Sequence, residues 1–165
     1  MGLAQVVAWR TVDLFDRATP SWDVGMNSVR LERPDLLHVV FRGPNELQDI
    51  LEMQRILFAV GDRFGPVDLL LGLGELESLG AGARGAWARV RRAYPFRNGF
   101  AYGANFGIRT LVHTTHRAGR IISPAFFQWD IFFFPTEAAA RTHIEAKRAP
   151  AERPGATALL NPRRA

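Results

Sequence analysis

Two histidines and three carboxylates are the residues of this sequence that could carry out acid–base chemistry. His113 and His116 form a His-Thr-Thr-His segment, and a helix there would place the two imidazoles on neighbouring positions. Asp130 stands inside an aromatic stretch, where loss of water would raise the pKa of its carboxyl and suit it to act as an acid or a base. Glu75 and Glu77 follow a glycine-rich break. If the protein is an enzyme, these five residues are its candidates.

The two histidines make a poor metal site. No carboxylate stands at a matching helical position, and Arg109, Arg117 and Arg120 share their predicted stripe and would repel a cation. A solvated basic face, or a surface for an acidic partner, explains this stripe more simply. The chain has no cysteine, and Gly72-Leu73-Gly74 does not have the spacing of a Rossmann or P-loop motif. We therefore expect neither a metal nor a cofactor.

The acidic residues Glu75 and Glu77 are positioned by the apolar run that precedes them. Residues 67–73 have no polar face, which is typical of a strand that helices cover on both sides. We expect this strand to end at the glycines that follow, and the chain to pass through an acidic turn up to Ser78. A helix should then begin at about Gly80.

The rest of the chain alternates strands and helices. Further strands are expected at 29–33, 36–41, 99–104 and 130–134, and further helices from Gly43-Pro44-Asn45, from Phe106 to Ala118 behind an Asn105 N-cap, and from a Thr136 cap to about Lys147. The helix after Gly80 should run to Pro95. The order β-β-α-β-α-β-α-β-α predicts an α/β fold, with a mixed, mostly parallel sheet and helices packed on it.

The length of 165 residues suits one domain with a single core. We expect an N-terminal extension at 1–28, the α/β domain at 29–148 and a disordered basic tail at 149–165. The formal net charge is +5, and residues 147–165 account for +4 of it. The excess therefore does not lie on a face of the domain, and no nucleic-acid partner is expected. The chain shows no membrane-spanning run and no signal peptide, which predicts a cytoplasmic protein of bacterial style without membrane insertion.

Aromatic side chains crowd the segment Pro124–Phe134, and they fall on both faces of any strand there. One interpretation is a strand covered on both sides together with a loop folded over the core. The other is that part of this segment lines a ligand pocket or a subunit interface. The candidates for such a pocket are Phe106, Phe126, Phe127, Trp129 and Phe134.

Three motifs resemble a known family. They are Leu-Gly-Glu-Leu-Glu-Ser-Leu-Gly-Ala-Gly-Ala-Arg at 73–84, Tyr-Gly-Ala-Asn-Phe-Gly-Ile-Arg at 102–109 and Phe-Phe-Pro-Thr-Glu-Ala-Ala-Ala-Arg at 133–141. Together with the order of elements from Val29 to Arg148, they resemble the STAS domain (sulfate transporter and anti-sigma-factor antagonist) in its bacterial stand-alone form, also called SEC14-like.

This resemblance implies a non-enzymatic regulatory module that binds a protein partner. Anti-sigma-factor antagonists of the family carry a phosphorylated serine just before the second helix, and the nearest residue here is Ser78. Ser78, Glu77 and Gly80 are therefore the candidate partner or phosphorylation site, although Leu79 stands where the family has a second serine. Capping of the helix by Ser78 is the competing interpretation. The alternative function is a small apolar ligand-binding protein or a small acid–base enzyme, with a pocket lined by the 124–134 segment.

Overall fold

The computed structural model describes residues 19–148, so the predicted tail at 149–165 and most of the predicted extension lie outside it. Six strands form one sheet in chain order. They are β1 (Ser21–Val24), β2 (Asn27–Arg33), β3 (Leu36–Asn45), β4 (Val67–Leu79), β5 (Phe96–Tyr102) and β6 (Asp130–Phe134). The helices are α1 (Leu47–Phe64), α2 (Ala81–Ala88), α3 (Phe106–Ile122) and α4 (Glu137–Arg148), with a short 3-10 helix, η1 (Pro124–Phe126), before β6.

The sheet is mixed and mostly parallel. The first three strands pair antiparallel, and β3 to β6 are parallel neighbours. Helices connect the parallel strands, as such crossovers require. The predicted α/β fold class is confirmed.

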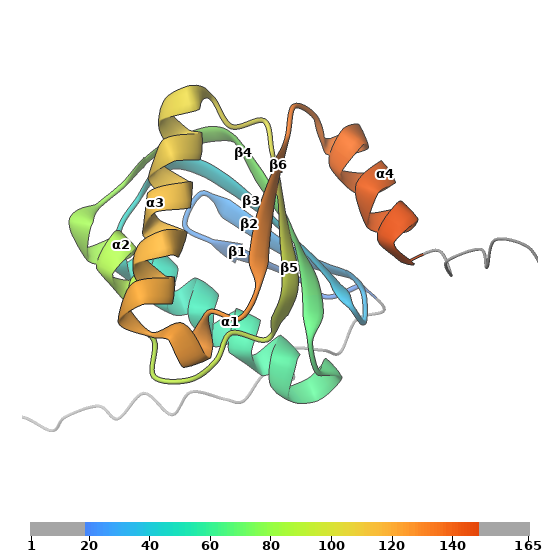
Figure 1. The fold of residues 1–165 in the computed structure, drawn as a ribbon, viewed down its shortest axis with the longest axis horizontal. Coiled ribbons are helices and arrows are strands. Elements are labelled where there is room, and N and C mark those ends of the chain that lie inside the picture. Colours follow the sequence, from blue (N-terminus) through green and yellow to red (C-terminus); the bar gives the residue numbers. More distant parts are fainter. Residues whose placement is uncertain (1–18, 149–165) are drawn as a thin grey trace, which may run out of the picture.

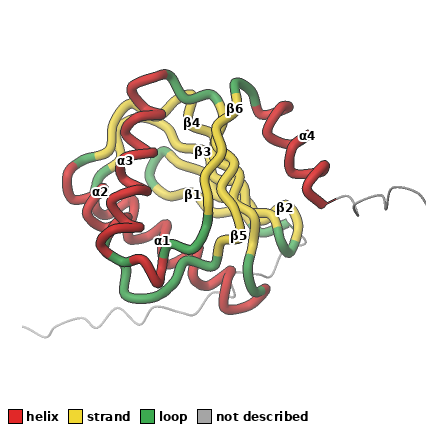
Figure 2. Tube along the Cα trace, in the orientation of Figure 1, coloured by secondary structure: helices red, strands yellow, loops and turns green. Residues whose placement is uncertain are grey.

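Helices cover the sheet on both faces (Figure 1). Helices α1, α2 and α3 lie on one side, and α4 lies alone on the other (Figure 2). The central strand β4 shows why its sequence has no polar face: Leu69 and Leu71 belong to the core under α1–α3, whereas Leu70 packs with Ala140 and Ile144 of α4. The aromatic segment divides in the same way, because Phe127 and Trp129 join the first core, and Phe132 and Phe134 the second.

The sheet has one strand more than the sequence predicts. Residues Ser21–Val24 form β1, which pairs with β2 across a tight turn in which Gly25 has a φ of 59°. This strand lies in the segment that was expected to be an extension. It is only four residues long, too short to show the alternation of apolar and polar residues by which a strand is predicted from sequence.

The predicted acidic turn is wrong. Strand β4 continues through Leu79, and Glu75, Glu77 and Ser78 lie on it with their side chains exposed while Leu76 and Leu79 are buried. The physical reason is pairing with β3, which also continues past its expected end, so that the predicted helix at Gly43 begins only at Leu47. Paired backbone groups keep both strands extended beyond the glycines.

Two helix starts are confirmed and two helix ends are not. Asn105 accepts a hydrogen bond from the Ile108 N–H at 2.9 Å, and Thr136 Oγ1 accepts one from the Ala139 N–H at 3.2 Å. Helix α2, however, ends at Ala88 instead of Pro95. Helix α3 runs past Gly119 to Ile122. Gly119 does not end the helix; it allows the Phe127 ring to pack against it, because a Cβ there would overlap that ring.

Candidate partner-binding face and apolar cavity

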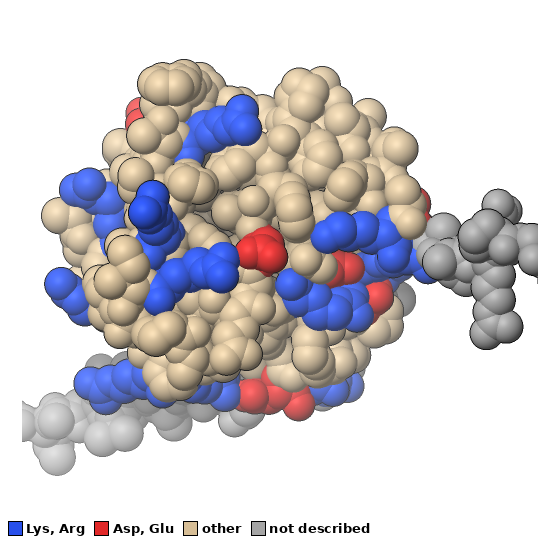
Figure 3. Space-filling view, in the orientation of Figure 1, with Lys and Arg blue, Asp and Glu red and all other residues tan. Residues whose placement is uncertain are grey.

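The outer surface of α2 and α3 is strongly basic. The chain has no Asp or Glu between Leu79 and Trp129, a stretch that contains eight arginines. Three of these have acidic partners, since Arg92 pairs with Asp62, Arg97 with Asp35 and Asp68, and Arg120 with Asp130. We define the arginine face as the four that form no ion pair within residues 19–148 and do not stack on an aromatic ring: Arg84, Arg89, Arg91 and Arg117. Figure 3 shows Lys and Arg side chains gathered on the side of the molecule where α2 and α3 lie.

A groove of about 350 Å³ separates α2 from α3. Arg84 of α2 and the α2 C-cap residue Arg89 line it on one side, and Ile122 lines it from the end of α3. Several small side chains, Thr114 and Thr115 complete the lining. Both arginines are exposed. The groove therefore presents two positively charged side chains and one large apolar side chain to solvent.

Three large apolar side chains of α3 are exposed to solvent. Phe106 at the start of the helix is 85% exposed, and Ile121 and Ile122 at its end are 73% and 51% exposed. The side of α3 that faces the sheet already contributes Ile108, His116 and Gly119 to the interior. Contiguous exposed apolar groups, such as the neighbouring Ile121 and Ile122, can mark a surface that another molecule covers.

The three predicted phosphorylation-site residues lie where β4 meets α2. Ser78 and Glu77 are exposed on the last residues of β4, where Ser78 is the register partner of Pro44. Gly80 is the N-cap of α2 and its N–H donates to the Asn45 carbonyl at 3.0 Å. No side chain caps α2, so the capping interpretation of Ser78 is wrong. Ser78 is therefore exposed, two residues before the Gly80 N-cap of α2.

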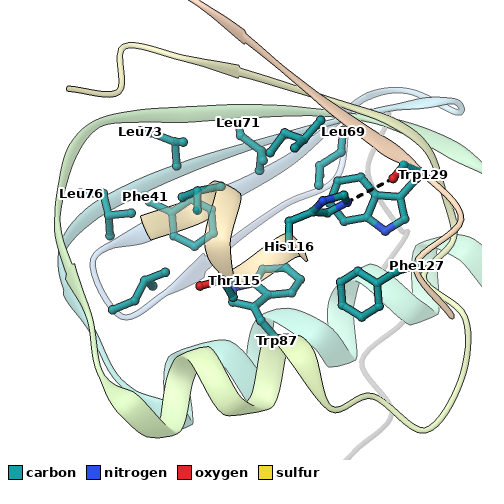
Figure 4. Close-up of a pocket in the computed structure, with 13 residues that line it drawn as sticks. Phe41, Leu69, Leu71, Leu73, Leu76, Trp87, Thr115, His116, Phe127 and Trp129 are labelled. Carbon is teal, nitrogen blue, oxygen red and sulfur yellow. Dashed lines mark hydrogen bonds between the residues drawn. The ribbon is translucent and has the colours of Figure 1, made fainter. Parts of the chain in front are cut away.

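An apolar cavity of about 60 Å³ lies beneath α2 and α3, on the sheet (Figure 4). Leucines of β4 line one side, and Trp87 of α2 with Val112 and His116 of α3 line the other. Of the predicted pocket residues, Phe127 and Trp129 line the cavity. Phe126 packs at the edge of the main core, Phe134 lies on the opposite face of the sheet and Phe106 is exposed.

His116 is the main polar group at the cavity, and its predicted place on a solvated stripe is wrong. The side chain is buried, and its Nε2–H donates to the Trp129 carbonyl at 3.1 Å. Burial lowers the pKa of His116, so the imidazole is neutral at pH 7. The indole N–H of Trp129 is also buried and has no hydrogen-bond partner within residues 19–148.

The five predicted acid–base residues do not form a common site. Asp130 is not desolvated among aromatic rings: its side chain is 64% exposed and pairs with Arg120 at 2.9 Å. Glu75 pairs with Arg42 at 3.4 Å, and His113 is exposed. No hydrogen bond or ion pair within residues 19–148 joins any two of the five. In the same residues, no three His, Asp or Glu side chains gather so that they could hold a metal ion, and no helix has the length and apolar character needed to span a membrane.

A different group of titratable residues does come together, under α4. His38 Nδ1–H donates to Glu32 at 3.1 Å, and His38 Nε2 is 2.9 Å from the Tyr102 hydroxyl. Arg141 of α4 donates two hydrogen bonds to Glu32, at 2.7 and 2.8 Å, and a third to Glu137. We call these five residues the α4 network.

The α4 network has strongly perturbed titration. The Arg141 hydrogen bonds lower the pKa of Glu32 to about 2, and burial lowers the pKa of His38. Burial also raises the pKa of Tyr102 to about 12. Every charged group of the network faces an opposite charge within it, so the arrangement docks α4 onto the sheet rather than offering a free acid or base.

Comparison with known proteins bears on the fold. No family model matches the sequence, and no curated protein matches it significantly. Among solved structures, an uncharacterised protein of the DUF3478 family from Shewanella loihica PV-4, described as having a SpoIIAA-like fold, aligns with a TM-score of 0.51. The alignment covers 77% of this chain and 95% of that one at 16% identity. The fold is SpoIIAA-like. The predicted STAS-like architecture, that of anti-sigma-factor antagonists, is therefore confirmed as a fold.

Proposed function

We propose that this protein is a non-enzymatic interaction module that binds a protein partner through the outer surface of α2 and α3. The observation that carries the proposal is the exposure of the adjacent Ile121 and Ile122 at the end of α3. A protein interface has an apolar centre with a polar rim, and on this SpoIIAA-like domain the isoleucines lie beside arginines that have no counter-ion. The scattered acid–base candidates, by contrast, give no support to catalysis.

Regulation by phosphorylation at Ser78 belongs to this proposal. Its hydroxyl is exposed where β4 leads into α2, and a phosphate there would add close to two negative charges at the edge of the basic surface. We expect Ser78→Asp to change partner affinity and Ser78→Ala to leave it unchanged. Equal affinity of both variants and the wild type would remove Ser78 from the proposal.

A photo-crosslinking experiment tests the proposed function. The photoreactive amino acid benzoylphenylalanine replaces Ile121 in the full chain, which is expressed in the cells that naturally produce it, and adducts are identified by mass spectrometry. The matched control carries the same group at Arg30, which is exposed on β2. We expect a defined protein adduct from position 121 and none from position 30. Identical adduct patterns at both positions would contradict the proposal.

The cavity favours a second candidate function, binding of a small apolar molecule. It is lined by leucines and aromatic rings, and its surface is almost entirely apolar. Its volume of about 60 Å³ is far below the roughly 300–1,000 Å³ of drug-sized sites, so the ligand would be a short chain or a small ring. Native mass spectrometry of the purified protein, followed by denaturation and analysis of what is released, tests this function. Protein that carries nothing, and that takes up no small apolar compound when incubated with a panel of them, would contradict it.

A further inference from the structure

We propose that the segment bound by α2 and α3 is an acidic amphipathic helix, seated in the groove between them. Its carboxylates would pair with Arg84 and Arg89, and an apolar side chain would cover Ile122. This inference rests on the proposed function, because it names the chemistry of the partner.

The first argument is local charge imbalance. Elsewhere on the described domain, most arginines are matched to carboxylates: Arg55 pairs with Glu52, Arg141 with Glu32 and Arg148 with Asp68, whereas Arg30 of β2 stands singly. By contrast, the stretch between Leu79 and Trp129, which contains the arginine face, has no Asp or Glu that could neutralise these arginines. A patch of one sign attracts a partner of the opposite sign and accelerates the encounter. The missing carboxylates are therefore expected on the partner.

The second argument is the shape of the groove. Its walls include Ala81, Gly85, Ala88 and Ala118, whose small side chains leave room for another element to approach the two helices. Arg84 of α2 and Arg89, the C-cap of α2, both line this space. Helices that bind in grooves use apolar anchors at one face and polar groups at its flanks. In the groove between α2 and α3, Ile122 can contact an apolar anchor of such a helix, and the two arginines can pair with acidic groups at its flanks.

The apolar side chains favour a protein over a nucleic acid or a membrane. A nucleic acid would place its hydrated phosphates against Ile121 and Ile122 and leave their apolar surface uncompensated. A membrane would need the exposed apolar groups in one plane near each other, but Phe106 and Ile121 stand at opposite ends of α3, about 22 Å apart along its axis. An amphipathic protein segment matches charge and apolar surface together.

The test uses a designed probe. A fluorescein-labelled 16-residue helical peptide carries leucine at every third or fourth position and glutamate on the flanking positions, and binding to the full chain is followed by fluorescence anisotropy. Two matched peptides carry lysine for every glutamate, or serine for every leucine. We expect binding of the acidic amphipathic peptide only, and at least a threefold loss of affinity in each of Arg84→Glu and Arg89→Glu. Arg30→Glu, with the same change of charge elsewhere, should lose less than twofold.

Each other outcome overturns the inference. Failure of the acidic peptide to bind does so, as does equal weakening by Arg30→Glu. Binding of a DNA duplex or of phosphatidylglycerol vesicles that depends on Arg84 while the peptide does not bind would assign the face to that ligand instead. The crosslinking at Ile121 separates this failure from failure of the proposed function. A defined partner whose crosslinked segment has no acidic excess would leave the interaction module standing and refute the acidic helix.

Discussion

Replacing Glu32 by glutamine tests the α4 network. The Arg141 hydrogen bonds lower the pKa of Glu32 from 4.5 to about 2, and at about 1.4 kcal/mol per unit this corresponds to about 3 kcal/mol at full value. The side chain is 20% exposed, so screening by solvent reduces the expected effect to about 1–2 kcal/mol. Glu32→Gln should lower the free energy of unfolding by that amount at pH 7, as measured by urea denaturation.

The pH dependence makes this prediction specific. Because the folded-state pKa of Glu32 is depressed, its contribution is present above pH 4.5 and is lost as the pH falls toward 2. The difference between wild type and Glu32→Gln should therefore shrink to less than half of its pH 7 value by pH 3. Glu52→Gln, which breaks an exposed pair within α1, is the control and should cost at most about 0.5 kcal/mol. A Glu32→Gln deficit that is equal at pH 7 and pH 3, or absent at pH 7, would refute the ionic account.

Three further substitutions test the packing and hydrogen bonds that position the two faces. Gly119→Ala should destabilise by about 1–3 kcal/mol in chemical denaturation, because its new Cβ overlaps the Phe127 ring, whereas Gly107→Ala in the same helix meets no close contact and should be neutral or stabilising. Asn105→Ala should cost about 1 kcal/mol through the lost N-cap, and Asn105→Ser should restore most of it; equal losses would argue against capping. Gly72→Ala places a Cβ 2.7 Å from the Tyr102 hydroxyl and displaces it toward solvent, so the Tyr102 pKa, which burial raises, should fall from about 12 toward 10 when followed by ultraviolet absorbance; an unchanged titration would show that the hydroxyl does not lie over Gly72.

The features that sequence predicted correctly are those whose causes are local or periodic. The run at 67–73 predicts a strand covered on both faces because its leucines occupy both faces and each of them favours burial. Asn105 and Thr136 predict helix starts because a cap acts on N–H groups only two or three residues away. The order of strands and helices then follows, and with it the fold class.

Pairing between distant segments explains the errors around β4. The glycines and acids after Leu73 have the composition of a turn, and nothing nearby in the sequence opposes that reading. The structure keeps them extended because Arg42 pairs with Glu75, and Asn45 with Leu79, in the β3–β4 ladder. The partner strand lies about thirty residues earlier in the chain, so a reading of local composition could not include it.

His116 shows the same limit for helices. Helical projection places it with the arginines of α3, and an exposed histidine follows from that grouping. In the structure, the segment that includes η1 and Trp129 folds back over this part of α3, and the Trp129 carbonyl accepts the imidazole proton. Periodicity identifies the sides of a helix but not the width of the surface that later segments cover.

The arginine face left a signal in the sequence that net charge concealed. Residues 29–146 are close to neutral in sum, yet the stretch from Leu79 to Trp129 contains no acid. A charge total averages over elements that the fold separates in space, so the sign of each segment is the informative quantity. The α4 network left no such signal, because Glu32, His38 and Tyr102 come from three strands and meet only across the sheet.

The two faces of the sheet differ in how completely the arginines of their helices are paired with carboxylates. Helix α4 buries Ala140 and Ile144 in the smaller apolar cluster, and its arginines form ion pairs with carboxylates of the same domain. On the other side, α2 and α3 are held by an apolar core and need no ion pairs for attachment, yet they carry arginines without counter-ions. Arginines without a counter-ion can form ion pairs when a second molecule supplies carboxylates. The side with the incomplete pairing is therefore the side on which a partner is expected.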